Sequence, residues 1–164
     1  MVEGRSGTDT LDFNGAGADE NMRLTPNGRR ALFLRDVGNI TMDMDDVERL
    51  DLTALEGVDT VTIDDMARTD LRRADVLLSA ATGGGDAGSD TVTVNGTARG
   101  DDIELQADGG RVDVEGLAPR VRIGDGETID RLQINALGGD DEIEVDADVE
   151  DVIGVAVDLG SGQR

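Results

Sequence analysis

The sequence predicts an all-β protein in which short strands stack in parallel sheets, as in a β-helix or β-roll-like solenoid. Three observations support this fold class. Apolar residues alternate with polar ones in many short runs, as they do in Ile143-Glu144-Val145. Glycine-aspartate turns precede several of these runs, and the whole pattern recurs at a long, constant offset. Period-two alternation indicates half-buried strands, and a fixed internal period is typical of repeat architectures.

The turn that carries the pattern is Gly-x-Asp-x-apolar. Glycine and aspartate both favour turns, and the apolar residue two positions after the aspartate begins the alternation of a strand. We therefore interpret each copy as one turn-plus-strand unit. The copies are residues 7–11, 57–61, 88–92 and 139–143.

The second half of the chain repeats the first at an offset of 81 to 82 residues. Asp9 corresponds to Asp90, and Asp59 corresponds to Asp141 after an insertion of one residue. The spacing predicts two tandem copies of one unit, residues 4–82 and 85–162, within a single solenoid domain that spans residues 1–164. The glycine-rich segment 81–88 lies between them.

Short strands are expected roughly every 9 to 11 residues, which leaves turns of ordinary length between them. The segment from Leu71 to Leu78 has some helical character, although its end could equally be a strand. The expected apolar pairs are 11 and 13, 22 and 24, 50 and 52, 61 and 63, 92 and 94, 103 and 105, 112 and 114, 121 and 123, 132 and 134, and 143 and 145.

An ordinary β-sandwich is the alternative fold. Asn-Gly and Asp-Gly dipeptides favour two-residue hairpins, and they occur at 14–15, 27–28, 95–96 and 108–109. The uniformly short strands and the glycine-aspartate turns instead favour a chain wound in one direction.

Composition limits the function classes. The net charge is −22, only 37% of residues are hydrophobic, and the two aromatic residues are Phe13 and Phe33. So much negative charge argues against nucleic acid or an anionic membrane as a partner. No stretch has the length of a membrane-spanning helix, and none has the apolar run of a signal peptide. The excess charge disfavours a compact chain unless something neutralises it, and bound cations are the simplest candidates.

Catalysis has little support in the residue types. The chain has no His, Cys, Lys or Tyr, so the common general bases and nucleophiles are missing. A β-helix enzyme that acts on carbohydrate, such as a polysaccharide lyase or hydrolase, is the alternative function. Its site would lie where Arg120 and Arg122 occur beside Asp125.

The residues also resemble a known family. Gly4-Gly7-Asp9-Leu11 and Gly85-Gly88-Asp90-Val92 match the Gly-x-x-Gly-x-Asp-x-apolar part of the nine-residue repeat of RTX, or haemolysin-type, calcium-binding proteins. The longer phrases 35–65 and 112–147 look like the degenerate solenoid spacer segments between such repeats. The resemblance implies a right-handed parallel β-roll, with Ca²⁺ held in the turns by aspartate carboxylates and backbone carbonyls.

Carried over to this chain, the resemblance makes five aspartates the candidate metal ligands. Calcium takes oxygen ligands, and Gly-Asp turns supply both carboxylates and free carbonyls. Each residue also has a simpler interpretation as a turn former. The candidates are Asp9, Asp90 and Asp141, followed by Asp59 and Asp101.

The sequence thus favours a non-enzymatic structural or adhesive module of a secreted or cell-surface bacterial protein that stiffens when it binds calcium. Its expected partners are calcium ions, a cell-surface or carbohydrate ligand, and flanking repeats of the same parent chain. A salt-adapted protein, whose acidity serves solvation alone, is a third interpretation.

Overall fold

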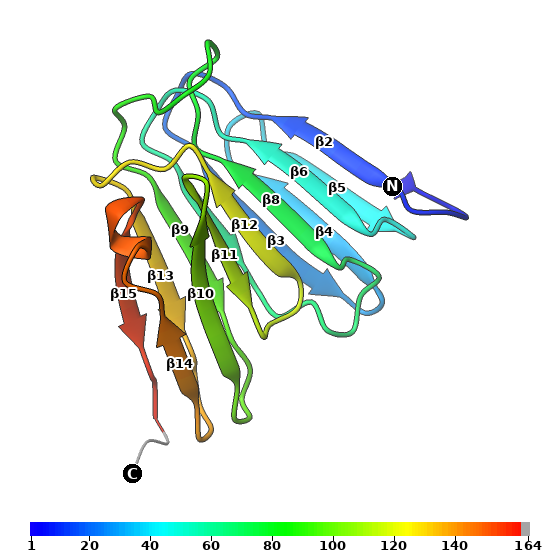
Figure 1. Ribbon diagram of the computed structural model, residues 1–164. Coiled ribbons are helices and arrows are strands. Elements are labelled where there is room, and N and C mark those ends of the chain that lie inside the picture. Colours follow the sequence, from blue (N-terminus) through cyan, green and yellow to red (C-terminus); the bar gives the residue numbers. More distant parts are fainter. Residues whose placement is uncertain (162–164) are drawn as a thin grey trace.

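The computed structural model describes residues 1–161 and is all-β (Figure 1). Gly162, the last residue of the second predicted repeat, lies outside the described residues. The elements are β1 (Val2–Glu3), β2 (Thr10–Asn14), β3 (Asn21–Asn27), β4 (Arg30–Arg35), β5 (Ile40–Asp45), β6 (Arg49–Thr53), β7 (Thr60–Ile63), β8 (Arg73–Leu77), β9 (Thr91–Asn95), β10 (Asp102–Asp108), β11 (Arg111–Glu115), β12 (Arg120–Gly124), β13 (Arg131–Asn135), β14 (Glu142–Val145), the 3-10 helix η1 (Val149–Asp151) and β15 (Gly154–Asp158).

The strands form two mixed sheets with one hydrophobic core. The first sheet has the order β1-β5-β4-β3-β7-β9-β13-β15, and the second has the order β14-β10-β11-β12-β8-β6-β2. In Figure 1 the sheets lie one behind the other, with the N-terminus at the β2 end and the C-terminus at the β14 and β15 end. The edge strands are therefore β1 and β2 at the N-terminal end of the array, and β14 and β15 at the C-terminal end.

Parallel pairing dominates because the chain keeps crossing from one sheet to the other. In the second sheet β2, β6, β8 and β12 are parallel neighbours. In the first sheet the parallel series is β3, β7, β9, β13 and β15. The segment with helical character is strand β8, whose Ala74 and Val76 are buried. A chain that returns to the same sheet after each crossing stacks its strands in one direction.

The expectation of uniformly parallel strands is wrong in two places. Strands β3, β4 and β5 are antiparallel, and so are β10, β11 and β12. Each set contains a tight hairpin at Gly28 or Gly109, where φ is +68° or +57°. A left-handed residue is what a two-residue hairpin requires. The Asn-Gly pairs at 14–15 and 95–96 instead end strands at the crossing between sheets.

Alternate residues of each strand point into the core. Phe13 and Phe33 meet there with ring centroids 4.6 Å apart, and Phe33 is 1% exposed. Burying an aromatic or branched side chain stabilises the fold by about 1.5–3 kcal/mol per residue. The buried apolar pairs include 22 and 24, 50 and 52, 61 and 63, 92 and 94, 103 and 105, 112 and 114, 121 and 123, and 132 and 134.

The strand pairings of the first half recur in the second with the sheets exchanged. Strands β2, β6 and β8 lie side by side in the second sheet, and their counterparts β9, β13 and β15 lie side by side in the first. Strands β3, β4, β5 and β7 correspond in the same way to β10, β11, β12 and β14. The backbone agrees at Leu55 and Leu137, where φ is +72° and +68°, and at Asp46 and Asp125, where φ is +52° and +57°.

Candidate cation sites

Four acidic residues form a buried stack along one corner of the first sheet, each directly before a strand. They are Glu20, Asp59, Asp90 and Asp130, which precede β3, β7, β9 and β13. Because these strands are parallel neighbours, the turns before them lie above one another. The four residues are between 1% and 3% exposed. We call them the carboxylate stack.

Backbone hydrogen bonds connect the carboxylate stack from one turn to the next. The N–H of Glu20 donates to Asp59 Oδ1 at 2.9 Å, and the N–H of Asp59 donates to Asp90 Oδ1 at 2.8 Å. The N–H of Asp90 donates to Asp130 Oδ1 at 2.9 Å. Each aspartate therefore satisfies a buried amide of the neighbouring turn, which is a structural reason for an acceptor at this position.

In two stack members, the second carboxylate oxygen has no hydrogen-bond partner among the described residues. Within residues 1–161, Oδ2 of Asp59 and Oδ2 of Asp90 are buried and accept no hydrogen bond. A buried polar atom without a partner costs free energy, and a buried charge costs more. These two oxygens are therefore the positions in the stack where a proton or a cation would relieve the cost.

The raised pKa values of the stack aspartates also indicate that their ionised forms are unfavourable. Burial raises the pKa of Asp59 to about 7, with a further contribution from the negative charges of Asp90 and Glu20. Burial likewise raises the pKa of Asp90 to about 6, assisted by the charges of Asp86 and Asp130. Burial also raises the pKa of Asp130. Removal from water and mutual repulsion both disfavour the ionised carboxylates.

One end of the stack carries its own positive charge. The Arg35 guanidinium forms an ion pair with Glu20, and the Arg35 and Glu20 side chains are 10% and 0% exposed. The same guanidinium lies 5.7 Å from the Phe13 ring centroid. For Asp59, Asp90 and Asp130, no ion pair with an arginine is found in the described part of the chain.

The five aspartates predicted from the sequence occupy equivalent turns but separate places. Asp59 and Asp90 are neighbours in the carboxylate stack. Asp101 and Asp141 are neighbours before β10 and β14 of the second sheet, where the Asp101 N–H donates to Asp141 Oδ1 at 2.9 Å. Asp9 precedes β2 at the other end of that sheet, and its N–H donates to Glu48 at 2.8 Å. Their role as metal ligands stays a prediction.

Two stack members were missed because they lack the sequence signature. Asp130 follows Thr-Ile and Glu20 follows Ala-Asp, so neither has a glycine two positions before it. The available signal was the position directly before an alternating strand, which both residues share with Asp59 and Asp90.

A separate group of three aspartates satisfies a distance criterion for metal binding. Carboxylate oxygens of Asp45, Asp46 and Asp70 all lie within 4.8 Å of one another, the only such group within residues 1–161. Calcium–oxygen distances of about 2.3–2.6 Å allow ligands at this separation. Asp45 ends β5, Asp46 follows it directly, and Asp70 comes from the loop before β8. The Arg29 guanidinium lies 3.7 Å from Asp70 and balances part of the charge.

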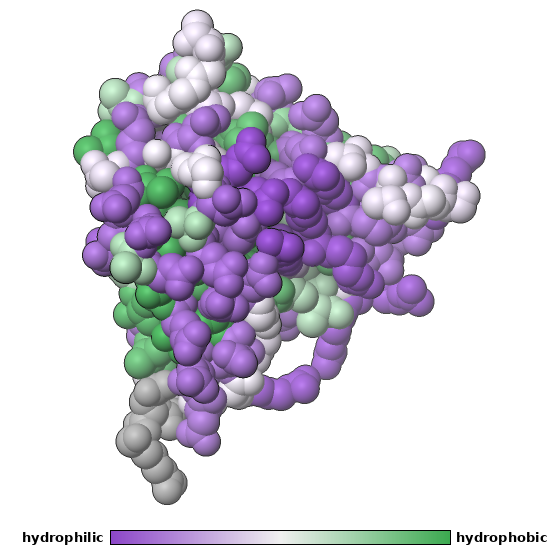
Figure 2. Space-filling view, viewed as in Figure 1, coloured by the Kyte–Doolittle hydropathy of each residue, from purple (hydrophilic) through white to green (hydrophobic). Residues whose placement is uncertain are grey.

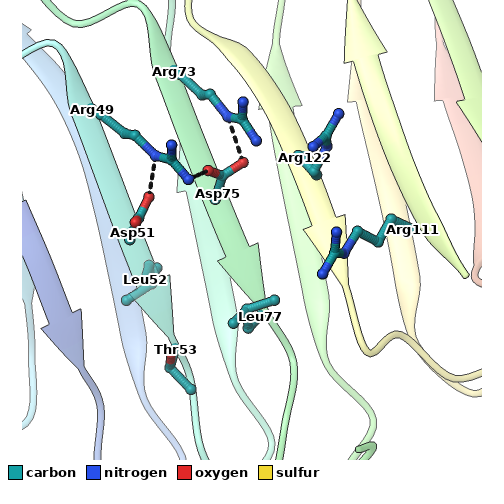
Figure 3. A pocket seen from close by; sticks show the side chains of 9 residues that line it. All are labelled: Arg49, Asp51, Leu52, Thr53, Arg73, Asp75, Leu77, Arg111 and Arg122. Carbon is teal, nitrogen blue, oxygen red and sulfur yellow. Dashed lines mark hydrogen bonds and ion pairs between the residues drawn. The ribbon is translucent and has the colours of Figure 1, made fainter. Parts of the chain in front are cut away.

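The outer face of the second sheet holds an arginine-lined pocket of about 180 Å³ (Figure 3). Arg49 contacts Asp51 at 2.6 Å and Asp75 at 2.5 Å, and Arg73 contacts Asp75 at 2.8 Å. Figure 3 shows the Arg49–Asp51 pair within β6 and the Arg73–Asp75 pair within β8. The Arg49–Asp75 pair joins the two strands, and Arg111 and Arg122 lie on the opposite side. The pocket carboxylates are therefore held by arginines of the same sheet.

Arg120 and Arg122, where the sequence analysis placed the alternative catalytic site, also form ion pairs with carboxylates of the same sheet. Arg122 donates two hydrogen bonds to Asp113, at 2.7 and 3.0 Å, and Arg120 contacts Glu115 at 2.6 Å. Burial opposes ionisation of Asp113, but the hydrogen bonds and charge of Arg122 and the charge of Arg120 outweigh it and lower the pKa. Asp125 lies in the turn after β12.

Comparison of the chain with protein-family models, with curated proteins and with solved structures finds no match. Within the described residues, no helix has the length and apolar character that crossing a membrane requires.

Proposed function

We propose that this chain is a non-enzymatic structural module, a short β-solenoid that acts as a spacer or adhesive stalk in a secreted or cell-surface protein and becomes stiffer when calcium neutralises its acidic turns. The observation that carries the proposal is the carboxylate stack. It places buried acidic groups in successive turns of the array, and within residues 1–161 an arginine pairs with this stack only at the Glu20 end.

The stack fits a cation-dependent fold because its free energy depends on charge at a buried position. Around neutral pH Asp59 and Asp90 are each divided between protonated and ionised forms, since their pKa values are about 7 and 6. A cation next to the unpartnered oxygens favours the ionised form and the folded chain together. Asp45, Asp46 and Asp70 offer a second place where a cation stabilises the junction between β5 and the loop before β8.

The arrangement of arginines supports a structural role over the carbohydrate-acting alternative. An acid–base mechanism needs a carboxyl group that is free to exchange a proton with the substrate. In the arginine-lined pocket, Asp51 and Asp75 are bound by Arg49 and Arg73, and Asp113 is bound by Arg122. Two of these ion pairs, Arg49 with Asp75 and Arg122 with Asp113, connect adjacent strands of the sheet.

The proposal is tested by urea unfolding of the full chain at pH 8, with calcium, magnesium or sodium chloride at matched ionic strength, and with a chelator. Calcium at 100 times its dissociation constant is expected to add about 2.7 kcal/mol to the free energy of unfolding. Sodium at equal ionic strength is expected to add less, because screening alone acts weakly on buried groups. Equal stability in calcium and in chelator would remove calcium from the account, and an equal gain from sodium would favour the salt-adapted interpretation.

Two variants separate the candidate places for the ion. Asp46→Asn with Asp70→Asn weakens the three-aspartate group without touching the carboxylate stack, and asparagine tolerates the positive φ of residue 46. Asp59→Asn with Asp90→Asn changes the stack and leaves the other group intact. Whichever double variant loses the calcium response identifies the place, and retention of the full response by both would refute both assignments.

A further inference from the structure

The C-terminal end of the array exposes side chains that face the interior of the fold. Val145 of β14, Val157 of β15 and Leu159 just after it are 40%, 41% and 36% exposed. Figure 2 shows hydrophobic residues along the side of the molecule where Figure 1 places β13, β14 and β15. Both β14 and β15 are also edge strands.

The first half of the chain shows what covers the same surface. The counterparts of Val145, Val157 and Leu159 are Ile63, Val76 and Leu78, and each of these is 1% exposed. They are buried because β9 pairs with β7 through four residues and β12 pairs with β8 through five. Within residues 1–161, the difference in exposure between equivalent positions thus depends on whether a further strand pairs with that edge.

The N-terminal end carries the counterparts of those covering strands. Strand β2 corresponds to β9, and no strand of the described part of the chain pairs with its outer edge in the second sheet. Strand β5 corresponds to β12. Interior residues at this end are incompletely covered: Leu11 and Met42 are half-buried, whereas Val92 and Val121, at the equivalent positions, are fully buried. The two ends therefore present complementary edges.

We propose that a second copy of this chain docks head to tail, with its β2 and β5 added to the β14 and β15 edges of the first copy. The register follows from the pairs inside the chain. Glu142 lies opposite Thr10 of the second copy, as Thr60 lies opposite Thr91, and Ile143 lies opposite Leu11, as Val61 lies opposite Val92. Val157 lies opposite Met44, as Val76 lies opposite Ile123.

Strand β1 occupies part of this docking surface in the single chain. Val2 and Glu3 pair in parallel with Met44 and Asp45, which is where Val157 and Asp158 of another copy would pair. The Gly4 N–H donates to the Asp45 carbonyl at 2.9 Å, as the Leu78 N–H donates to the Gly124 carbonyl at 3.0 Å. A strand of two residues is a weak competitor for a strand of five, so β15 displaces β1 when two copies meet.

The contact is heterologous, because one end of the molecule binds the other end. Such an interface generates open-ended chains of copies rather than a closed dimer. Within the described residues, the outer faces bring like charges together at Glu144 and Asp12, so association increases with salt that screens them. The inference depends on the strand pairings. Because the register places Asp158 opposite Asp45 of the three-aspartate group, it is tested without calcium.

Sedimentation velocity of the full chain over a range of concentrations, at moderate salt and with chelator, tests the inference. We expect a concentration-dependent series of species, which removal of residues 1–3 enhances. Val157→Arg is expected to abolish the series, since it places a charge in the contact. Val58→Arg is the matched control, because Val58 is 53% exposed in a turn away from the edges. A monomer at every concentration, with and without residues 1–3, would overturn the inference, as would equal loss in both arginine variants.

A crosslink tests the register. The chain has no cysteine, so Thr10→Cys and Glu142→Cys can be made in separate preparations and mixed. Paired residues on neighbouring strands have Cα atoms about 5 Å apart, which suits a disulfide. We expect a mixed dimer under mild oxidation, more abundant than from Thr10→Cys mixed with Asp108→Cys. Asp108 ends β10 beside the hairpin, six residues along that strand from Asp102, the partner of Glu142. Equal yields from the two mixtures would contradict the proposed register, whatever the outcome of the calcium experiment.

Discussion

Replacing Asp59 by asparagine tests the electrostatic account of the carboxylate stack most directly. Burial raises the pKa of Asp59 from its ordinary value of 3.8 to about 7, so the folded chain binds a proton that the unfolded chain has released. A group with a raised pKa contributes stability at low pH, and this contribution is lost as the pH rises through the folded-state value. The free energy of unfolding of the natural chain should therefore fall between about pH 4 and pH 7.

The magnitude follows from the size of the shift. One pKa unit corresponds to about 1.4 kcal/mol, so Asp59 contributes at most about 4 kcal/mol to this fall. We expect a measured loss of roughly 2–4 kcal/mol between pH 5 and pH 8, because the repulsion that Asp59 shares with Asp90 is counted in both pKa values. Asp59→Asn keeps an oxygen that can accept the Glu20 N–H and removes the titrating charge.

Urea unfolding in chelator, at pH 5 and pH 8, measures the effect. At pH 5 the variant should be less stable than the natural chain by about 1–3 kcal/mol, since its amide N–H group is buried without an acceptor. At pH 8 the two should be close, because the natural chain has lost the protonated form. Asp140→Asn is the control, since Asp140 is exposed and should leave the pH dependence unchanged. Parallel pH profiles for Asp59→Asn and the natural chain would refute the reasoning.

Three further changes test other parts of the structure. Arg35→Met leaves the fully buried Glu20 without its ion-pair partner and should lower the free energy of unfolding by about 3–5 kcal/mol. In a double-mutant cycle, adding Glu20→Gln should recover part of this loss. If the second change recovers no stability, the buried ion pair is contradicted. Gly57→Ala places a Cβ 2.7 Å from the Ala18 carbonyl oxygen, at a φ of +150°, and should lower the midpoint of thermal unfolding. Gly28→Asn, at a hairpin with open space around it, should leave the midpoint nearly unchanged. Equal midpoints for the two variants would count against the close approach at Gly57. Phe33→Ala removes the ring that packs on Phe13 and should cost about 3–5 kcal/mol in urea unfolding, and a loss below about 1 kcal/mol would contradict its place in the core.

Local sequence patterns are enough to predict the strands and much of the core. Period-two alternation at Val92 and Val94, or at Leu132 and Ile134, is a local property, and the side chains that it predicts to be inward are buried. Turn chemistry is equally local. Gly28 and Gly109 adopt the left-handed conformation that two-residue hairpins need.

The pairing of the strands and the contacts between carboxylates, in contrast, are seen in the folded chain and not in the sequence. The same Asn-Gly dipeptide makes a hairpin at 27–28 and a crossing between sheets at 14–15, because the apolar partners available to the next strand select the outcome. The 81-residue offset does not reveal that equivalent strands lie in opposite sheets. Asp70 joins Asp45 and Asp46, and Asp130 joins Asp90, through packing between segments distant in the chain. Such contacts depend on how the two whole sheets pack together, and a local sequence pattern carries no information about that packing.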